Sequence, residues 1–182
     1  MAINGLVKVY FADGVHLIYS YQDGYFWSKE RISVPSAYGR KRVNLLGFMN
    51  AVTYETERVT DDPYLDADSV CDGLEKVRES NPNDMIYIIL DNAKYQKCKK
   101  VKQKAQTLNI NLIYLPSYSP NLNLIERLWK FLRKKVLAGT YHKSFELFKI
   151  SIEEFIDTLH IKYAEQLQSL LSFNFELLDS VV

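Results

Sequence analysis

Two short apolar runs organise the middle of the chain. Met85–Leu90 is unbroken and is followed by Asp91, and Leu112–Leu115 is stopped by Pro116. Between the two runs, apolar positions recur at helical spacing at Cys98, Val101, Ala105 and Leu108. This pattern predicts a strand, a helix and a second strand. Because such crossovers are right-handed and join parallel strands, we expect Asp91 and Pro116 at the same edge of one sheet.

The first half of the chain has the alternating pattern of strands. Val7, Val9, Phe11 and Asp13 alternate on one face, which predicts a strand that ends at Asp13. Asp23-Gly24 predicts a turn before a strand at Tyr25–Trp27, and Arg42–Thr53 predicts another strand. Gly47 inside the latter indicates a bulge or a close backbone approach. We therefore expect an antiparallel meander of three strands.

Helical periodicity marks the remaining segments. Pro63 and Asp66 precede apolar residues at helical spacing, and another helix is expected to start near Asn123, after the turn-rich Ser117–Asn121. Beyond Gly139, apolar residues recur at three- and four-residue steps, which predicts one long amphipathic helix or two that cover the sheet. The expected fold class is α/β, with a mixed five-stranded sheet of three antiparallel and then two parallel strands flanked by helices.

Composition limits the class of protein. With 182 residues, of which 47% are hydrophobic, the chain can bury a core and fits one domain over 1–182, with 140–182 as a C-terminal helical portion. No apolar stretch approaches the roughly 20 residues that span a bilayer, and the start lacks a signal-peptide pattern. A cytoplasmic protein without a membrane partner is expected. Isolated Cys71 and Cys98 indicate buried helix positions, and the three histidines have no metal-ligand spacing.

Three acids form the candidate site. Asp91 follows the buried strand, and Glu126 falls in the first turn of the helix that begins beyond Pro116. Asp13 has the inward parity of its strand. Open α/β sheets bind ligands at the carboxyl ends of parallel strands, and carboxylate oxygens suit Mg²⁺ or Mn²⁺. We therefore expect Asp13, Asp91 and Glu126 to be catalytic metal ligands, with Asn92 orienting Asp91.

Each acid alone has a structural alternative. Asp13-Gly14 is an ordinary turn pair, Asp91-Asn92 could cap a helix, and Asn123 with Glu126 has the spacing of a capping box. These alternatives stay open for each residue taken singly. Their conjunction at one sheet edge favours the metal site.

Charge is unevenly distributed although the net charge is only +1. Glu55 to Asp84 holds ten acids against three bases, whereas Lys94 to Lys104 holds six lysines and no acid. Basic stretches of this kind can be solvated helix faces, but beside an acidic site they favour binding to a phosphate backbone. The residues expected to contact such a backbone are Arg40, Lys41, Arg42, Lys94, Lys97, Lys99, Lys100, Lys130, Arg133 and Lys134.

The order of the motifs resembles a known family. ILDNA contains Asp91, LPSYSPNLNLIERLWKFLRKKV contains Glu126, and thirty-four residues lie between these two acids. With Asp13 this is similar to the catalytic domain of mariner-type bacterial insertion-sequence transposases, which are D,D,E recombinases with a ribonuclease H-like fold. The resemblance covers roughly residues 6 to 137. Gln96 stands where many relatives have His, and Leu124 where many have Pro.

The resemblance implies a function. It implies DNA cleavage at transposon ends and strand transfer into target DNA, with two Mg²⁺ or Mn²⁺ ions, by a homodimer at the nucleoid of a bacterium. The upstream helix-turn-helix domain of such transposases is expected to be absent, because the first strand begins within ten residues of Met1. Two alternatives stay open: a ribonuclease H-like nuclease without strand transfer, and an inactive transposase remnant that acts as a dimerising regulator.

Overall fold

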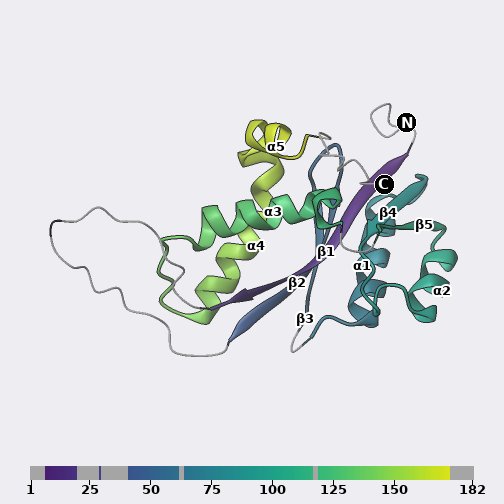
Figure 1. The fold of residues 1–182 in the computed structure, drawn as a ribbon, viewed down its shortest axis with the longest axis horizontal. Helices are drawn as coiled ribbons and strands as arrows, with labels where there is room; N and C mark the ends of the chain where they lie inside the picture. The colour runs from purple at the N-terminus through teal and green to yellow at the C-terminus, as the bar shows by residue number, and fades with distance from the viewer. Residues whose placement is uncertain (1–6, 20–28, 30–40, 62–63, 117–118, 173–182) are drawn as a thin grey trace, which may run out of the picture.

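Five strands form one mixed sheet in the order β3-β2-β1-β4-β5 (Figure 1). The structure is a computed structural model that describes residues 7–19, 29, 41–61, 64–116 and 119–172. The strands are β1 (Lys8–Ile18), β2 (Arg42–Asn50), β3 (Thr56–Asp61), β4 (Ile86–Leu90) and β5 (Ile110–Tyr114). Strands β1, β2 and β3 pair antiparallel, whereas β4 and β5 continue the sheet parallel to β1. The predicted fold class is therefore confirmed.

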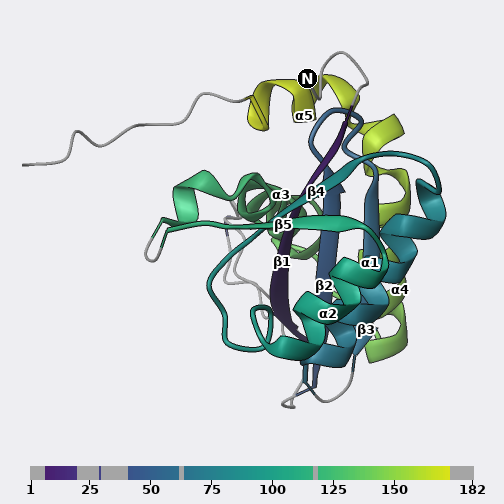
Figure 2. The same cartoon turned by 90° about the vertical axis from the view of Figure 1, so that its right-hand side faces the viewer.

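Helices cover both faces of this sheet. On one face lie α1 (Ala67–Ser80) and α2 (Lys99–Thr107), which also contact each other (Figure 2). On the opposite face lie α3 (Leu124–Leu132) and α4 (Phe145–Lys162), followed by the short α5 (Ala164–Leu170). The predicted C-terminal periodicity thus corresponds to two helices. None of the helices in the described part of the chain is long and apolar enough to cross a membrane.

Two shorter helical turns flank α3. A 3-10 turn (Pro120–Leu122) leads into it, and a π-helical turn (Arg133–Leu137) follows it. The start of α3 after Asn123 confirms the predicted boundary.

Alternation along β1 and β2 divides the core into two layers. Phe11, Val15 and Leu17 point towards α3 and α4, whereas Tyr10 and Ala12 point towards α1 and α2. Strand β2 alternates in the same way, and eight of its nine residues are buried. A strand with helices on both faces has no solvent side, which explains its nearly continuous apolar sequence.

Two features of the antiparallel part differ from the sequence prediction. The predicted strand Tyr25–Trp27 lies outside the described residues, and β1 pairs directly with β2, so the third antiparallel strand is β3. Strand β1 also does not end at Asp13 but continues to Ile18, with Asp13 opposite Gly47 and Gly14 opposite Leu46. The turn interpretation of Asp13-Gly14 is therefore wrong. Burial of Val15 and Leu17 beneath the helices stabilises the extra length.

Candidate active site

Asp13 lies within β1, on the face covered by α3. The indole Nε1–H of Trp129 donates a hydrogen bond to its Oδ2 over 3.2 Å. The backbone N–H of Gly14 donates a second. Opposite Asp13 on β2 is Gly47, and an added Cβ there would come within 2.5 Å of the Trp129 ring. The predicted close approach at Gly47 is confirmed, and its partner is an aromatic side chain.

Asp91 is the first residue after β4. The parallel ladder of β1 and β4 ends at the pair Phe11 and Ile89, and each aspartate follows two residues later in the chain. The charge of Asp91 raises the pKa of Asp13, so the two carboxylates lie near each other. Asp91 Oδ1 accepts the N–H of Ala93 over 3.0 Å, which makes a tight turn rather than a helix cap. Helix α2 begins at Lys99, and its N-cap residue is Cys98, seven positions after Asp91. The helix-cap interpretation of Asp91 is therefore wrong.

Asn92 holds this turn against the neighbouring strand. Its Nδ2 donates to the carbonyl of Leu115, just beyond β5, and its Oδ1 accepts from Lys97 Nζ over 3.4 Å. Leu115 N–H also donates to the Leu90 carbonyl over 2.8 Å. The ends of β4 and β5 are thus bonded to each other, as predicted for Asp91 and Pro116.

Glu126 lies in the first turn of α3 and is partly buried. The preceding N-cap residue, Asn123, makes no side-chain cap hydrogen bond. Instead its Nδ2 donates to the carbonyl of Ala12 on β1 over 3.2 Å. The capping-box interpretation of Asn123 and Glu126 is therefore wrong. A helix that is bonded to residue 12 carries its first-turn glutamate to the neighbourhood of Asp13.

The three acids influence one another electrostatically. Burial raises the pKa of Asp13 to about 7, and the negative charges of Asp91 and Glu126 contribute to the rise, which the Gly14 and Trp129 hydrogen bonds oppose. The pKa of Glu126 is raised mainly by burial and also by Asp91, against the lowering effect of Lys130. Burial and the charges of Asp91 and Asp13 also raise the pKa of the Tyr95 phenol. The fold therefore gathers negative charge at one position.

A family model described as DDE superfamily endonuclease matches residues 8–149, which include all three acids. The chain belongs to this superfamily. A relative in Sinorhizobium fredii (strain NBRC 101917 / NGR234), the uncharacterized protein y4pE/y4sA, is 31% identical over 85 residues, which are 46% of this chain and 61% of that protein.

Solved structures show the same fold. The Mos1 mariner paired end complex with Mn aligns with a TM-score of 0.64 and 17% identity, over 94% of this chain and 57% of that chain. The Mos1 transposase catalytic domain with raltegravir and Mn aligns with a TM-score of 0.59 and 15% identity, over 91% of this chain and 80% of that chain. The endonuclease domain described here thus has the ribonuclease H-like fold. It spans less than two thirds of the paired-complex transposase chain and of the Sinorhizobium relative.

The donor set at the site suits a hard divalent cation. Carboxylate oxygens are the ligands that Mg²⁺ and Mn²⁺ prefer, and a cation would relieve the mutual repulsion that raises the pKa of Asp13. Within the described ranges, however, no group of three His, Cys, Asp or Glu side chains is arranged to hold an ion by itself. Magnesium sites commonly include water and substrate phosphate oxygens, so protein side chains need not supply every ligand of the ion.

Trp129 and Asn123 are site residues that the sequence reasoning did not single out. Both are buried, and both bond to β1 at or beside Asp13. A signal for Trp129 was present, because it stands three residues after Glu126 and therefore on the same side of a helix. Gly47 was noticed, but the residue that fills its space is 82 positions away in sequence and could not be assigned from local pattern.

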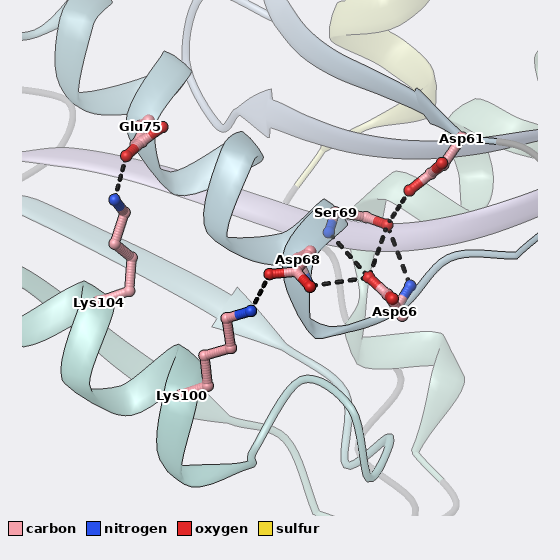
Figure 3. Close-up of polar contacts among 7 residues, drawn as sticks. All are labelled: Asp61, Asp66, Asp68, Ser69, Glu75, Lys100 and Lys104. Atoms are coloured by element: carbon pink, nitrogen blue, oxygen red, sulfur yellow. Dashed lines mark hydrogen bonds and ion pairs between the residues drawn. The ribbon is translucent and has the colours of Figure 1, made fainter.

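Five of the six lysines in the basic run from Lys94 to Lys104 fall into two groups, and the sixth, Lys102, lies over the ring of Tyr114. Lys100 and Lys104 form ion pairs with Asp68 and Glu75 of α1 (Figure 3), which raise the pKa of both lysines. By contrast Lys94, Lys97 and Lys99 are exposed near the Asp91 turn. Because Lys100 already neutralises an acid, it is a poorer candidate for a phosphate contact than its neighbours.

The other predicted DNA contacts lie on three segments. Arg40 is outside the described residues, whereas Lys41 and Arg42 lie over the rings of Phe145 and Tyr64. Lys130 and Lys134 line a cleft of about 490 Å³ between α3 and α5, which also contains Arg127 and Phe131. This cleft combines positive charge with an aromatic wall on the helix that carries Glu126. Arg133, at the start of the π-helical turn, is partly buried.

Proposed function

We propose that this chain is the catalytic domain of a mariner-type transposase, which cleaves DNA at transposon ends and joins the freed end to target DNA. The observation that carries the proposal is the position of Asp13 and Asp91 just beyond the last pair of the β1 and β4 ladder, with Asp91 and Glu126 near enough to raise the pKa of Asp13. Membership of the DDE endonuclease superfamily supports it, as does the fold shared with the Mos1 transposase.

In this proposal Asp13, Asp91 and Glu126 hold Mg²⁺ or Mn²⁺, two ions in the complete complex. When bound, the cations would stabilise negative charge on the attacking and leaving oxygens of a phosphodiester. The chain's own residues gather the carboxylates and partly bury Asp13. The exposed Lys97 and Lys99, together with Lys130 and Lys134, hold the DNA backbone by charge.

The reaction would consist of two in-line displacements. Water first attacks a phosphorus at the transposon end, and the bond to the 3′ oxygen breaks, which leaves a 3′-hydroxyl. This hydroxyl then attacks a target phosphodiester, loses its proton, and expels the target's 3′ oxygen. The second step exchanges one phosphodiester bond for another and so needs no external energy source. We place the reaction at the bacterial nucleoid, in a homodimer.

The test measures Mg²⁺-dependent nicking of transposon-end DNA and joining of a pre-cut 3′-hydroxyl end. Glu126→Gln keeps the length of the side chain but removes its charge. We expect nicking to fall roughly 100- to 1,000-fold, as when other preorganised active-site groups are removed. The melting temperature of the metal-free variant should be unchanged or higher, because carboxylate repulsion is relieved. Retained nicking would remove Glu126 from the site.

Joining separates the proposed transposase from its alternatives. A nuclease without strand transfer would nick but leave the pre-cut end unjoined. Absence of metal-dependent nicking in the wild-type chain would favour an inactive remnant and overturn the proposed function.

A further inference from the structure

Trp129 makes a polar contact from α3 to the sheet at the candidate site. Its side chain is 3% exposed, and its Nε1–H donates to Asp13 Oδ2 over 3.2 Å. A buried indole N–H needs an acceptor, since leaving it unpaired costs free energy. Here the acceptor is one of the three acids rather than a backbone carbonyl. The contact therefore links the packing of α3 to the orientation of a carboxylate.

Gly47 provides the space in which this indole lies. A Cβ added at Gly47 would come within 2.5 Å of Trp129 Cη2 and 2.8 Å of Cζ2. Both atoms belong to the six-membered ring of the indole, and a phenylalanine ring would not reach as far. Asp13 and Gly47 are cross-strand partners. Because Gly47 has no side chain, the Trp129 ring fits beside it and the indole N–H reaches Asp13.

A second contact fixes the beginning of the same helix. Asn123 is 2% exposed and donates from Nδ2 to the carbonyl of Ala12 over 3.2 Å. Residues 123 and 129 therefore bond to the successive β1 residues 12 and 13, and Glu126 lies midway between them in the sequence. Two bonds at separate points prevent the helix from sliding or rotating on the strand. The distance between Glu126 and Asp13 is thereby set.

We propose that Trp129 is a positioning residue that holds the Asp13 carboxylate in register with Glu126, and that Gly47 is the gap that admits it. The inference rests on the proposed function, because it assigns Asp13 and Glu126 to one site. Trp129 acts through Asp13, by orienting one carboxylate oxygen and by covering it from solvent. It has no role in bond making or breaking.

The contact itself can be tested without any metal or DNA. The chain has two tryptophans, Trp27 and Trp129, so the ¹H–¹⁵N spectrum contains two indole signals, and Trp129→Phe assigns them. Asp13→Ala removes the acceptor and should move the Trp129 indole signal substantially. Asp91→Ala is the matched control, since it removes an acid that Trp129 does not contact, and should move the signal much less. Equal movement in both variants would overturn the contact.

The positioning role is tested by Mn²⁺ affinity and by nicking kinetics. Trp129→Phe keeps a buried ring but loses the N–H, and we expect about 10-fold weaker Mn²⁺ binding and a similarly lower kcat, as for other groups that orient metal ligands. The KM for DNA should be unchanged. Ile152→Val, in the same core on α4, is the stability control: it should lower the melting temperature without affecting Mn²⁺ affinity.

Gly47→Ala supplies an independent perturbation. It should weaken Mn²⁺ binding in the wild-type background, because the indole must move, but have a much smaller further effect in Trp129→Phe, where the obstructing indole atoms are absent and only Ile125 Cδ1, at 3.1 Å, remains close. Additive losses would mean that Gly47 acts separately and would overturn its assigned role. Wild-type Mn²⁺ affinity and kcat in Trp129→Phe would overturn the positioning role alone. If wild-type and Asp91→Ala proteins bound Mn²⁺ equally, the proposed function would fail together with this inference.

Discussion

The helix pair α1 and α2 and the candidate site beneath α3, on the opposite face of the sheet, differ in how their charges are arranged. On the outer side of the α1 and α2 face, acids meet bases: Asp68 pairs with Lys100 and Glu75 with Lys104 (Figure 3). Beneath α3, on the other face, Asp13 has Asp91 and Glu126 as electrostatic neighbours, and their charges raise its pKa. The α1 and α2 side neutralises these charges in exposed ion pairs, whereas the site beneath α3 concentrates acids in a partly buried place. Elsewhere on that side, α4 also forms an ion pair, between Asp157 and Arg58.

The charges in these two places should therefore affect stability and metal binding differently. Exposed ion pairs contribute about 0–1 kcal/mol each, so the α1 and α2 face gains little from its charges and depends on apolar packing. A cluster of like charges costs free energy in the metal-free protein, and such costs are typical of functional sites. The comparison predicts that substitutions on the first face lower stability without changing metal binding, whereas removal of an acid from the second face weakens metal binding and does not lower the stability of the metal-free protein.

Gly73→Ala should produce the largest loss of stability. Gly73 lies in α1 against β2, and an added Cβ would come within 2.0 Å of the Phe48 ring, which is fully buried. Alanine favours a helix by up to about 1 kcal/mol over glycine. Overpacking a filled core costs typically 1–3 kcal/mol and occasionally more. We expect the overpacking to win, with a net loss of about 2 kcal/mol in the free energy of unfolding.

Denaturant titration measures the loss in the free energy of unfolding of Gly73→Ala. A Mn²⁺ titration of the folded variant tests whether metal binding changes as well. If the two faces are independent, the affinity for Mn²⁺ should stay at the wild-type value. A stabilised Gly73→Ala protein would contradict the close packing of α1 on β2, and a large loss of metal affinity would contradict the independence of the faces.

Asp13→Asn should stabilise the metal-free protein at high pH. Between pH 3.8, the ordinary pKa, and about 7, folded Asp13 keeps a proton that the unfolded chain releases. The folded state then binds more protons, so stability falls as the pH rises through this window. A pKa near 7 corresponds to at most ~4 kcal/mol, which solvent screening reduces to about 2 kcal/mol.

Free energies of unfolding at pH 5 and pH 8, without divalent metal, measure this effect. The wild type should lose stability between these pH values, and Asp13→Asn should lose much less and be the more stable protein at pH 8. The raised pKa of Glu126 leaves a smaller slope of the same sign. Identical pH profiles in both proteins would mean that Asp13 titrates normally.

The smallest expected effect concerns the two groups of lysines. Replacing the exposed Lys97 and Lys99 by alanine should reduce the slope of log affinity for DNA against log salt concentration by about 1.8, or about 0.9 for each lost phosphate contact. The matched control removes the ion pair of Lys100 and Asp68 together, which leaves the net charge unchanged. Its slope should equal that of the wild type. Equal slopes in all three proteins would mean that Lys97 and Lys99 are solvated side chains that make no phosphate contact.

Local pattern predicted the second half of the fold well. The apolar run before Asp91 became β4, the periodic segment after it became α2, and the helix beginning at Asn123 is α3. These elements are strongly patterned and bounded by Pro, Asn or Asp, so neighbouring residues alone determine them. The positions of Asp91 directly after β4 and of Glu126 in the first turn of α3 followed from the same pattern.

The first half was harder to predict because tertiary contacts override local signals there. Asp13-Gly14 has the sequence of a turn, but pairing with β2 and burial of Val15 extend the strand through it. Strand β3 has one buried residue, Val59, as an edge strand next to acidic side chains, and so has little periodicity. Cys98, expected on a buried helix face, is the partly buried N-cap of α2. The contact between Trp129 and Asp13 joins residues 116 positions apart, beyond the reach of any local pattern.

The continuation of β1 past Asp13 gives the three carboxylates unequal mechanical roles. Asp13 belongs to a ladder that is bonded to β2 on both sides of it, from Tyr10 to Ile18, so it cannot shift without moving the sheet. Glu126 belongs to a helix that Asn123 and Trp129 bond to β1, so it is held against the same ladder. Asp91 stands on a turn after β4, where the backbone has more freedom. Asp13 is thus the fixed reference of the site, and Asp91 is the acid with the most freedom to move relative to it.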